Sequence, residues 1–288
     1  MAGYKIYTDS ACDISPELLK KWEVKEIPLT FRFTDSEKEY NNEDMPTSEF
    51  YEKMKAGGVA KTAAINTEGF KAAFRESLDL GLDVIYLGFS SGLSTTFNSA
   101  RVAALELSEE YPQRKIIASD TLCASAGCGL MVYFAKKLRD EGADIEAIDD
   151  FVKEKAPKLS HWFTVDDLVY LKRGGRISPT LAFVGNVLGI KPVLHVDDEG
   201  HLINMSKVRG RRTAIAALAD KYGELGNNGG EDTLFISHAD CLSDAELLRS
   251  MLAEKYGAKV ELITEIGPVI GAHSGPGTLA LFFLGKNR

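Results

Sequence analysis

The stretch that decides the fold lies in the first third of the chain and reads Asp83-Val84-Ile85-Tyr86-Leu87-Gly88-Phe89-Ser90-Ser91-Gly92-Leu93-Ser94-Thr95-Thr96. Its first half is a continuous apolar run, which is typical of a strand buried on both faces. The run then passes through small and hydroxyl-bearing residues into a helical pattern with an apolar face at Ala100, Ala103, Ala104 and Leu107. A strand that enters a helix through such a turn brings free backbone N–H groups and hydroxyls together, and this arrangement suits an anion.

Two interpretations of this turn concern its hydroxyl groups. In the first, the turn is a cradle for a bound anion: Ser94 or Thr95 caps the following helix, and the nearby hydroxyls and N–H groups face a carboxylate or a phosphate. In the second, Ser94 only caps its own helix, which is the common role of such a serine. The stretch by itself favours the second interpretation, so the first needs support from elsewhere in the chain.

A third interpretation is enzymatic. Residues 88–92 match the G-x-S-x-G elbow of serine hydrolases, in the strand–turn–helix context that the elbow requires. His238 or His273 would then act as general base for Ser90. However, the first histidine of the chain is His161, so the upstream oxyanion motif of lipases is missing, and several serines of the turn compete for the role. A serine hydrolase that uses Ser90 is therefore the alternative function.

Composition limits the class of protein. The chain has 288 residues, of which 44% are hydrophobic and 26% charged, as in a globular protein with a sizeable core. A net charge of −8 disfavours nucleic acid and anionic membrane surfaces as partners. No apolar run is long enough to span a membrane, and residues 1–10 do not resemble a signal peptide. The four cysteines make no disulfide framework, so we expect a cytoplasmic protein.

The order of the patterns predicts the fold class. Up to about residue 155, strand patterns alternate with helical patterns, which predicts an α/β domain with a mostly parallel sheet. After that point, the hairpin signal at residues 197–200 and two further strand–helix pairs predict a mixed α+β domain. We therefore expect two domains, over residues 1–155 and 156–288.

Four local expectations belong to segments with weaker patterns. Residues 27–33 are predicted to form one strand, because apolar residues alternate there with polar neighbours. Residues 59–66 are predicted to be a small-residue connection that carries Thr62, and residues 271–277 a glycine-rich loop that carries His273. Residues 243–246 match a capping box that opens a helix.

Basic side chains gather at two places in this acidic chain. One group brackets a Gly-Gly turn, and the other lies at the end of the predicted hairpin: Lys172, Arg173 and Arg176, and Lys207, Arg209, Arg211 and Arg212. Arginines are suited to phosphate or carboxylate because their N–H groups form a fork. For any single arginine, however, a solvated surface role is the commoner one.

Metal and nucleotide sites have little support in the sequence. Cys123 and Cys128 lack a second pair of ligands, and His195 and His201 lie on either side of the hairpin turn. The chain has neither a P-loop nor a G-x-G-x-x-G fingerprint after a strand. We therefore expect no metal, no cofactor and no catalytic residue in this chain.

Several segments taken together resemble the DegV family of bacterial fatty-acid-binding proteins over nearly the full length of the chain. Each segment is short, but their order and spacing are specific. The segments are Thr8-Asp9-Ser10-Ala11-Cys12-Asp13, the turn with Thr62, Ser90-Ser91-Gly92-Leu93-Ser94, Leu171-Lys172-Arg173-Gly174-Gly175-Arg176-Ile177-Ser178, Gly189-Ile190-Lys191-Pro192 and His273-Ser274-Gly275-Pro276-Gly277.

The resemblance implies a function. It implies two α/β-type domains that enclose a long-chain fatty acid such as palmitate or oleate, with its carboxylate held by Thr62 and Ser94. It places the remaining site residues at Ser91, His273, Arg173 and Arg209. It also implies that the chain is not an enzyme alone but the carrier subunit of a bacterial fatty acid kinase. In that role it would present the carboxylate to a separate ATP-binding subunit and retain the acyl phosphate.

Overall fold

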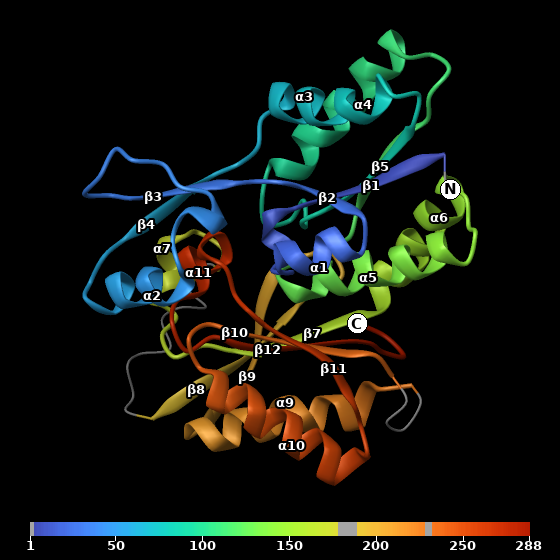
Figure 1. Ribbon diagram of the computed structural model, residues 1–288. Helices are drawn as coiled ribbons and strands as arrows, with labels where there is room; N and C mark the ends of the chain where they lie inside the picture. Colours follow the sequence, from blue (N-terminus) through green and yellow to red (C-terminus); the bar gives the residue numbers. More distant parts are fainter. Residues whose placement is uncertain (1–2, 178–188, 228–231) are drawn as a thin grey trace.

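The computed structural model describes residues 3–177, 189–227 and 232–288. Its strands form two large sheets, which lie one above the other in Figure 1 with helix α5 (Ala126–Asp140) between them. Helix α5 contacts strands of both sheets, so it is the shared layer of the molecule. The site described below lies between the two sheets, and the turns that follow strands of the first sheet supply part of its walls.

The first sheet is parallel, in the order β2-β1-β5-β6, and helices cover both of its faces. Its strands are β1 (Tyr4–Asp9), β2 (Val24–Ile27), β5 (Asp83–Gly88) and β6 (Ile116–Asp120). Helices α3 (Thr67–Leu78) and α4 (Thr96–Glu110) share one apolar core with the sheet, and α1 (Pro16–Lys21), α5 and α6 (Ile145–Lys155) share the other. Strand β5 is apolar along its length because both of its faces are covered.

The second sheet is mixed, in the order β11-β10-β12-β7-β8-β9, and only β10 and β11 pair in parallel. Its strands are β7 (Leu159–Thr164), β8 (Ile190–Val196), β9 (Leu202–Arg209), β10 (Leu234–His238), β11 (Val260–Glu265) and β12 (Leu279–Leu284). Helices α9 (Arg211–Leu225) and α10 (Leu242–Tyr256) cover the face that lies lowest in Figure 1. The predicted α/β fold, with a parallel first sheet and a mixed second one, is confirmed.

A smaller layer joins the two halves of the chain. Strands β3 (Thr30–Phe33) and β4 (Ala60–Ala63) form an antiparallel pair, and α2 (Thr47–Lys55) follows β3. They pack against α11 (Pro268–Ser274), which lies near α7 (Val169–Arg173) at the left of Figure 1. The Tyr51 hydroxyl of α2 donates to the Ile266 carbonyl over 2.7 Å. Residues 30–63 therefore cross from the first half of the chain to the second.

Two of the local expectations about strands were wrong. Residues 27–33 form parts of two strands in different sheets, because Pro28 has no N–H and interrupts the ladder after Ile27. Residues 59–66 are more than a connection, since β4 lies there and pairs with β3, with Thr62 opposite Phe31. Strand β4 has little apolar alternation, and only its long-range partner makes it a strand.

Two expectations about helix ends were also wrong. His273 lies in the last turn of α11 rather than in a loop. The glycine at position 271 is there for close packing, because a Cβ atom would meet the Tyr51 hydroxyl at 2.5 Å. Helix α10 begins at Leu242, one residue before the expected capping box, and the Asp244 carboxylate pairs with Arg211 at 2.8 Å.

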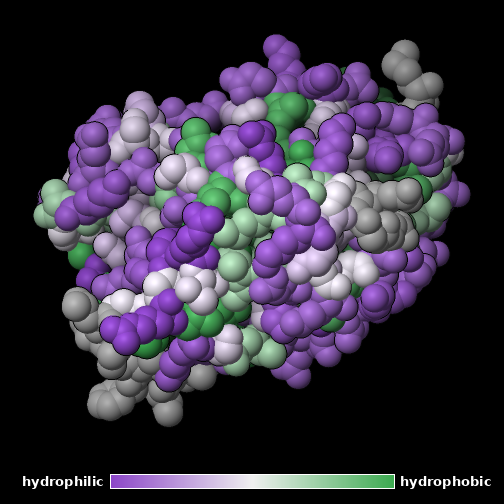
Figure 2. Space-filling view, turned by 90° about the horizontal axis from the view of Figure 1, so that it is seen from below, coloured by the Kyte–Doolittle hydropathy of each residue, from purple (hydrophilic) through white to green (hydrophobic). Residues whose placement is uncertain are grey.

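Polar and charged side chains cover most of the face seen from below, and apolar side chains form a patch in its middle (Figure 2). Within the described ranges, none of the helices combines the length and the apolar character needed to cross a bilayer.

Candidate functional site

A cavity lies between the first sheet, the second sheet and α11. Together with the part that opens to solvent, it has about 760 Å³ of empty space. Its walls come from the turn after β5, the segment before α5, strands β4, β7, β8, β9 and β12, and helices α7 and α11. Most of the lining side chains are apolar, so the cavity suits a hydrocarbon.

Strand alternation explains the apolar floor of this cavity. In β7, His161 and Phe163 line the cavity, whereas Trp162 between them packs into the core under α9 and α10. In β12, Ala280 and Phe282 line the cavity in the same way. Successive side chains of a strand point to opposite faces, so one apolar strand supplies both the cavity and the core.

Polar groups gather at one end of the cavity. Thr62 of β4 and His273 of α11 meet there, with 2.8 Å between Oγ1 and Nε2. Ser94, in the turn before α4, lines the same cavity. Its Oγ lies 2.9 Å from Thr96 Oγ1 and accepts a hydrogen bond from Thr96 N over 3.2 Å. When the Thr96 hydroxyl donates to Ser94, the Ser94 proton is free for a ligand.

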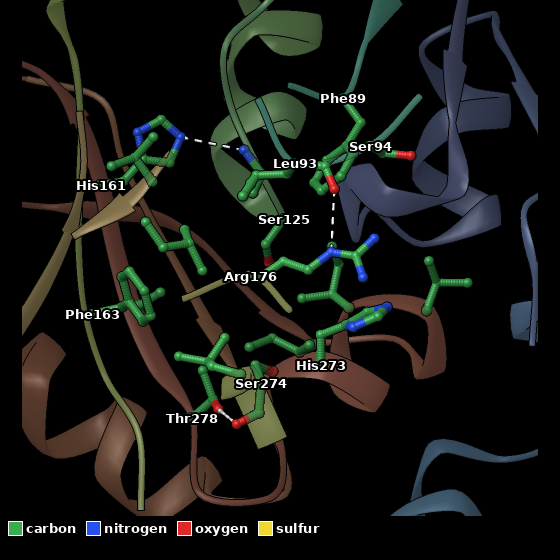
Figure 3. A pocket seen from close by; sticks show the side chains of 18 of the residues that line it. Phe89, Leu93, Ser94, Ser125, His161, Phe163, Arg176, His273, Ser274 and Thr278 are labelled. Atoms are coloured by element: carbon green, nitrogen blue, oxygen red, sulfur yellow. Dashed lines mark hydrogen bonds between the residues drawn. The ribbon is translucent and has the colours of Figure 1, made fainter. Parts of the chain in front are cut away.

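Arg176 supplies the positive charge at this end. Its Nε donates to the Leu93 carbonyl over 3.2 Å, and its Nη1 donates to the Gly174 carbonyl. Figure 3 shows its guanidinium between Ser94 and the ring of His273. Among the described residues it forms no ion pair. A half-buried guanidinium whose described hydrogen bonds go to carbonyls is a ready partner for a carboxylate.

The imidazole of His273 is neutral at physiological pH. Burial, and then the nearby charge of Arg176, lower its pKa to about 4. Its Nδ1 is buried without a hydrogen-bond partner within the described part of the chain, packed against Gly174, where a Cβ would meet it at 2.3 Å. In the tautomer that carries its proton on Nε2, His273 donates to Thr62. The Thr62 hydroxyl is then free to donate into the cavity.

A second, more polar cleft adjoins the same end on the outside. It has about 600 Å³ of empty space, counting open solvent, and Thr62, Arg176 and His273 line both it and the cavity. Lys61 and Arg173 also line it. The structure thus places Arg173 beside the polar end but in the outer cleft, with its guanidinium 5.8 Å from the centre of the Tyr170 ring.

The structure brings some of the expected site residues together and leaves others outside. Thr62, Ser94 and His273 line the cavity, and Arg173 lines the adjoining cleft. Ser91 is exposed, and its N–H points to the Asp120 carboxylate at 3.4 Å. Arg209 is exposed at the end of β9, opposite Ile190, and lines neither space.

The geometry around Ser90 does not fit a hydrolase. The side chain is fully buried, and its Oγ donates to the Gly200 carbonyl over 3.0 Å and accepts from Gly92 N over 3.2 Å. None of the histidines in the described segments is hydrogen-bonded to it, and His273 is engaged with Thr62. Ser90 therefore anchors the tip of the β8–β9 hairpin to the turn after β5.

Sequence reasoning missed the role of Arg176 and the floor of the cavity. The sequence marks Arg176 only as a member of a basic group. Its place in the cavity depends on the contact with Leu93, which lies 83 positions away in the chain. Strand β12 is apolar throughout, and both β7 and β12 are buried along nearly their whole length, so the sequence does not distinguish cavity walls from core.

Comparisons with known proteins agree with this architecture. The family model described as "Uncharacterised protein, DegV family" matches residues 4–286. A DegV domain-containing protein of Clostridium perfringens is 42% identical, over 100% of this chain and 99% of its own length. The chain therefore belongs to the DegV family.

Two solved structures connect this family with lipids. A DegV family protein from Thermus thermophilus, described by its fatty acid binding, is 30% identical with a TM-score of 0.87, over 98% of this chain and 99% of that one. A stearic-acid-binding protein from Eubacterium ventriosum is 26% identical with a TM-score of 0.88, over 98% of each chain.

Proposed function

We propose that this protein binds one long-chain fatty acid, such as palmitate or oleate, with its hydrocarbon chain in the cavity and its carboxylate at the polar end. The observation that carries the proposal is the guanidinium of Arg176, which forms no ion pair with any described residue and lies at the head of a mostly apolar cavity, beside Thr62, Ser94 and His273. Fatty acid binding in the Thermus relative and stearic acid binding in the Eubacterium relative support it.

The energetics fit a carrier. Each buried methylene contributes about 0.8 kcal/mol, so a chain of about sixteen carbons supplies on the order of 12 kcal/mol before ordering and association costs are subtracted. The polar end contributes specificity more than affinity. A desolvated carboxylate is tolerated only with hydrogen bonds and a counter-charge, and Thr62, Ser94 and Arg176 provide these.

We also propose that the protein is a carrier rather than an enzyme by itself, and that it presents the carboxylate to the ATP-binding subunit of a fatty acid kinase. The outer cleft supports this, because it lies against the same polar end and carries Lys61 and Arg173. Those cations suit the phosphoryl group of an acyl phosphate.

The lipid proposal is tested by denaturing the purified protein and identifying the released lipid by mass spectrometry, followed by binding assays on delipidated protein. Wild type should bind palmitate more tightly than hexadecanol. The Arg176→Met variant keeps the aliphatic stem but removes the charge. It should lose most of this preference, by about tenfold in the ratio of dissociation constants. An unchanged preference would contradict the assignment of Arg176 as the counter-charge.

The carrier proposal needs a separate test. A fatty acid kinase ATP-binding subunit should form acyl phosphate from palmitate only when this chain is present. Equal turnover without the chain would show that the chain is not the carrier. The serine hydrolase alternative is tested with a fluorophosphonate probe, which should leave Ser90 unlabelled because its hydroxyl is buried and already hydrogen-bonded.

A further inference from the structure

The opening motif at residues 8–13 lies at the carboxyl end of β1 and takes no direct part in the site described above. Its polar side chains are nonetheless buried and bonded to walls of the cavity. The Asp9 carboxylate accepts a hydrogen bond from Phe89 N over 3.0 Å, and Ser10 Oγ accepts one from Leu29 N over 3.0 Å. Phe89 and Leu29 both line the cavity. The motif therefore lies behind the cavity walls and holds several of their residues by hydrogen bonds.

Within this motif, Asp13 makes hydrogen bonds to residues that are far away in the chain. Its carboxyl group accepts a hydrogen bond from the Ser125 hydroxyl and one from Gly267 N over 2.9 Å. Its carbonyl accepts from Thr264 Oγ1 over 2.8 Å. Ser125 lines the cavity next to α5, whereas Gly267 is the N-cap of α11. One side chain that is 6% exposed thus ties together two walls from different halves of the chain.

The first turn of α11 is capped by side chains from the other half of the chain. Gly267 has no side chain to cap the helix, and Pro268 has no N–H. Gly267 N is satisfied by Asp13, and Val269 N by the Asn42 Oδ1 over 3.1 Å. A Cβ at position 267 would meet Asn42 Nδ2 at 2.7 Å and Asp13 Oδ1 at 3.2 Å, so glycine is required for this close approach.

The backbone at this junction is strained in a way that needs such support. Asp13 has a φ of +52° and Ser125 a φ of +53°, values that residues with a Cβ seldom adopt. The Ser125 hydroxyl also lies 2.9 Å from Ser237 Oγ of β10. Hydrogen bonds to Asp13, Ser237 and Gly267 therefore hold a strained segment in place beside the cavity.

We propose that Asp13 is a positioning residue: by capping α11 and bonding Ser125, it sets the location of α11 and thereby the contact between His273 and Thr62. His273 is the sixth residue of α11, about 7.5 Å along the axis from the first residue, Pro268. A small rotation at the capped end therefore moves the imidazole away from Thr62. The inference concerns the same cavity as the proposed function and depends on that function only for its binding readout.

The neutral form of the Asp13 carboxyl group fits this role. Burial raises its pKa to about 8, against the lowering effect of the Ser125 and Gly267 hydrogen bonds. A neutral carboxyl group can accept from Gly267 N with one oxygen while the other is shared with Ser125. Asparagine has the same shape and also one acceptor oxygen. It should therefore keep the geometry, whereas alanine removes both connections.

The test follows the His273 imidazole by NMR in delipidated protein. In wild type and Asp13→Asn, His273 should titrate well below its ordinary pKa and keep its tautomer. In Asp13→Ala, its pKa should move back towards the ordinary value, and the affinity for palmitate should fall about tenfold or more. Glu26→Gln serves as a control, because Glu26 is a largely buried carboxyl group without a hydrogen bond to α11.

A second variant covers the case in which Asp13→Ala does not fold. Gly267→Ala removes no polar group, and the φ of −69° at this position is compatible with alanine. The added methyl group should nevertheless push the side chains of Asp13 and Asn42 away from α11. Gly267→Ala should therefore change the pKa of His273 in the same direction as Asp13→Ala. The proposal is overturned if a folded Asp13→Ala leaves the His273 signals unchanged, if Gly267→Ala does so where Asp13→Ala does not fold, or if Asp13→Asn shifts the signals as far as Asp13→Ala or Gly267→Ala. Should wild type fail to bind palmitate, the proposed function falls, while the His273 signals still decide the role of Asp13.

Discussion

At the scale of single residues, the site combines neutral hydrogen-bond donors with the positive charge of Arg176. Thr62 and Ser94 offer hydroxyls, His273 is held neutral, and among the described residues Arg176 is bonded to backbone carbonyls without an ion pair. A carboxylate forms hydrogen bonds here and is also attracted by the positive charge of Arg176, whereas an alcohol forms only the hydrogen bonds. The arrangement therefore favours an acid over a neutral lipid of equal length.

Thr62 can be tested by two substitutions of different severity. Thr62→Ala removes the hydroxyl that joins His273 to the ligand, and palmitate affinity should fall about tenfold, the usual cost of one hydrogen bond to a charged group. Thr62→Ser keeps the hydroxyl and should stay close to wild type. Displacement of a fluorescent fatty acid from delipidated protein measures both. Equal affinity of the alanine variant and wild type would remove Thr62 from the site.

The buried histidine also predicts how stability depends on pH. The pKa of His273 is about 4 in the folded state and about 6.5 when unfolded, so between these pH values the unfolded state binds more protons. Stability should therefore fall as the pH drops from about 6.5 to 4, by on the order of 3 kcal/mol from this group. His161, His195 and His238, whose pKa values burial also lowers, act in the same direction.

Denaturant unfolding at pH 7 and pH 5 measures this dependence. His273→Gln retains a polar side chain but cannot titrate, so its stability should fall less between the two pH values than that of wild type. Identical losses in the two proteins would show that His273 is protonated as easily in the folded state as in the unfolded state.

At the scale of elements, successive side chains of strand β12 point alternately into the cavity and into the core. Ala280 faces the cavity, whereas Leu281 is fully buried under α9 and α10. Ala280→Leu should shorten the preferred fatty acid by filling cavity space, with little loss of stability. Leu281→Ala should cost about 2–5 kcal/mol of unfolding free energy and leave the chain-length preference unchanged.

Competition among fatty acids of different length, together with denaturant unfolding of both variants, separates the two effects. If Ala280→Leu left the length preference unchanged, the hydrocarbon chain would not run along β12. A change of preference in Leu281→Ala would mean that the two faces of the strand are not independent.

The elements also differ in how well the local sequence predicts them. Strand β5, helix α4 and the β8–β9 hairpin follow from local patterns, because continuous apolar runs, helical spacing and turn residues all act within a few residues. Strand β4 and helix α11 do not. Strand β4 exists through its pairing with β3, and the glycine at 271 weakens the helical pattern of α11 for the sake of packing on Tyr51.

At the scale of the whole molecule, the site exists only where the two halves of the chain meet. Thr62 and Ser94 come from the first half, and Arg176 and His273 from the second. The contacts that hold the halves together lie next to the cavity: Arg176 with the Leu93 carbonyl, Tyr51 with the Ile266 carbonyl and Asp13 with Gly267 N. A ligand in the cavity touches both halves and should stabilise their association.

The sequence by itself determined the class of fold and the family, and the family resemblance pointed to Thr62, Ser94 and His273, which the structure places in the lining of the cavity. These depend on local periodicity and on short motifs, which a linear chain displays directly. Only the tertiary structure decided that Arg176 rather than Arg173 enters the cavity, that Ser91 and Arg209 lie outside it, and that Asp13 caps α11. The physical reason is that these facts rest on contacts between residues far apart in the chain, such as the 254 positions between Asp13 and Gly267. No local pattern records which distant backbone groups a side chain will meet.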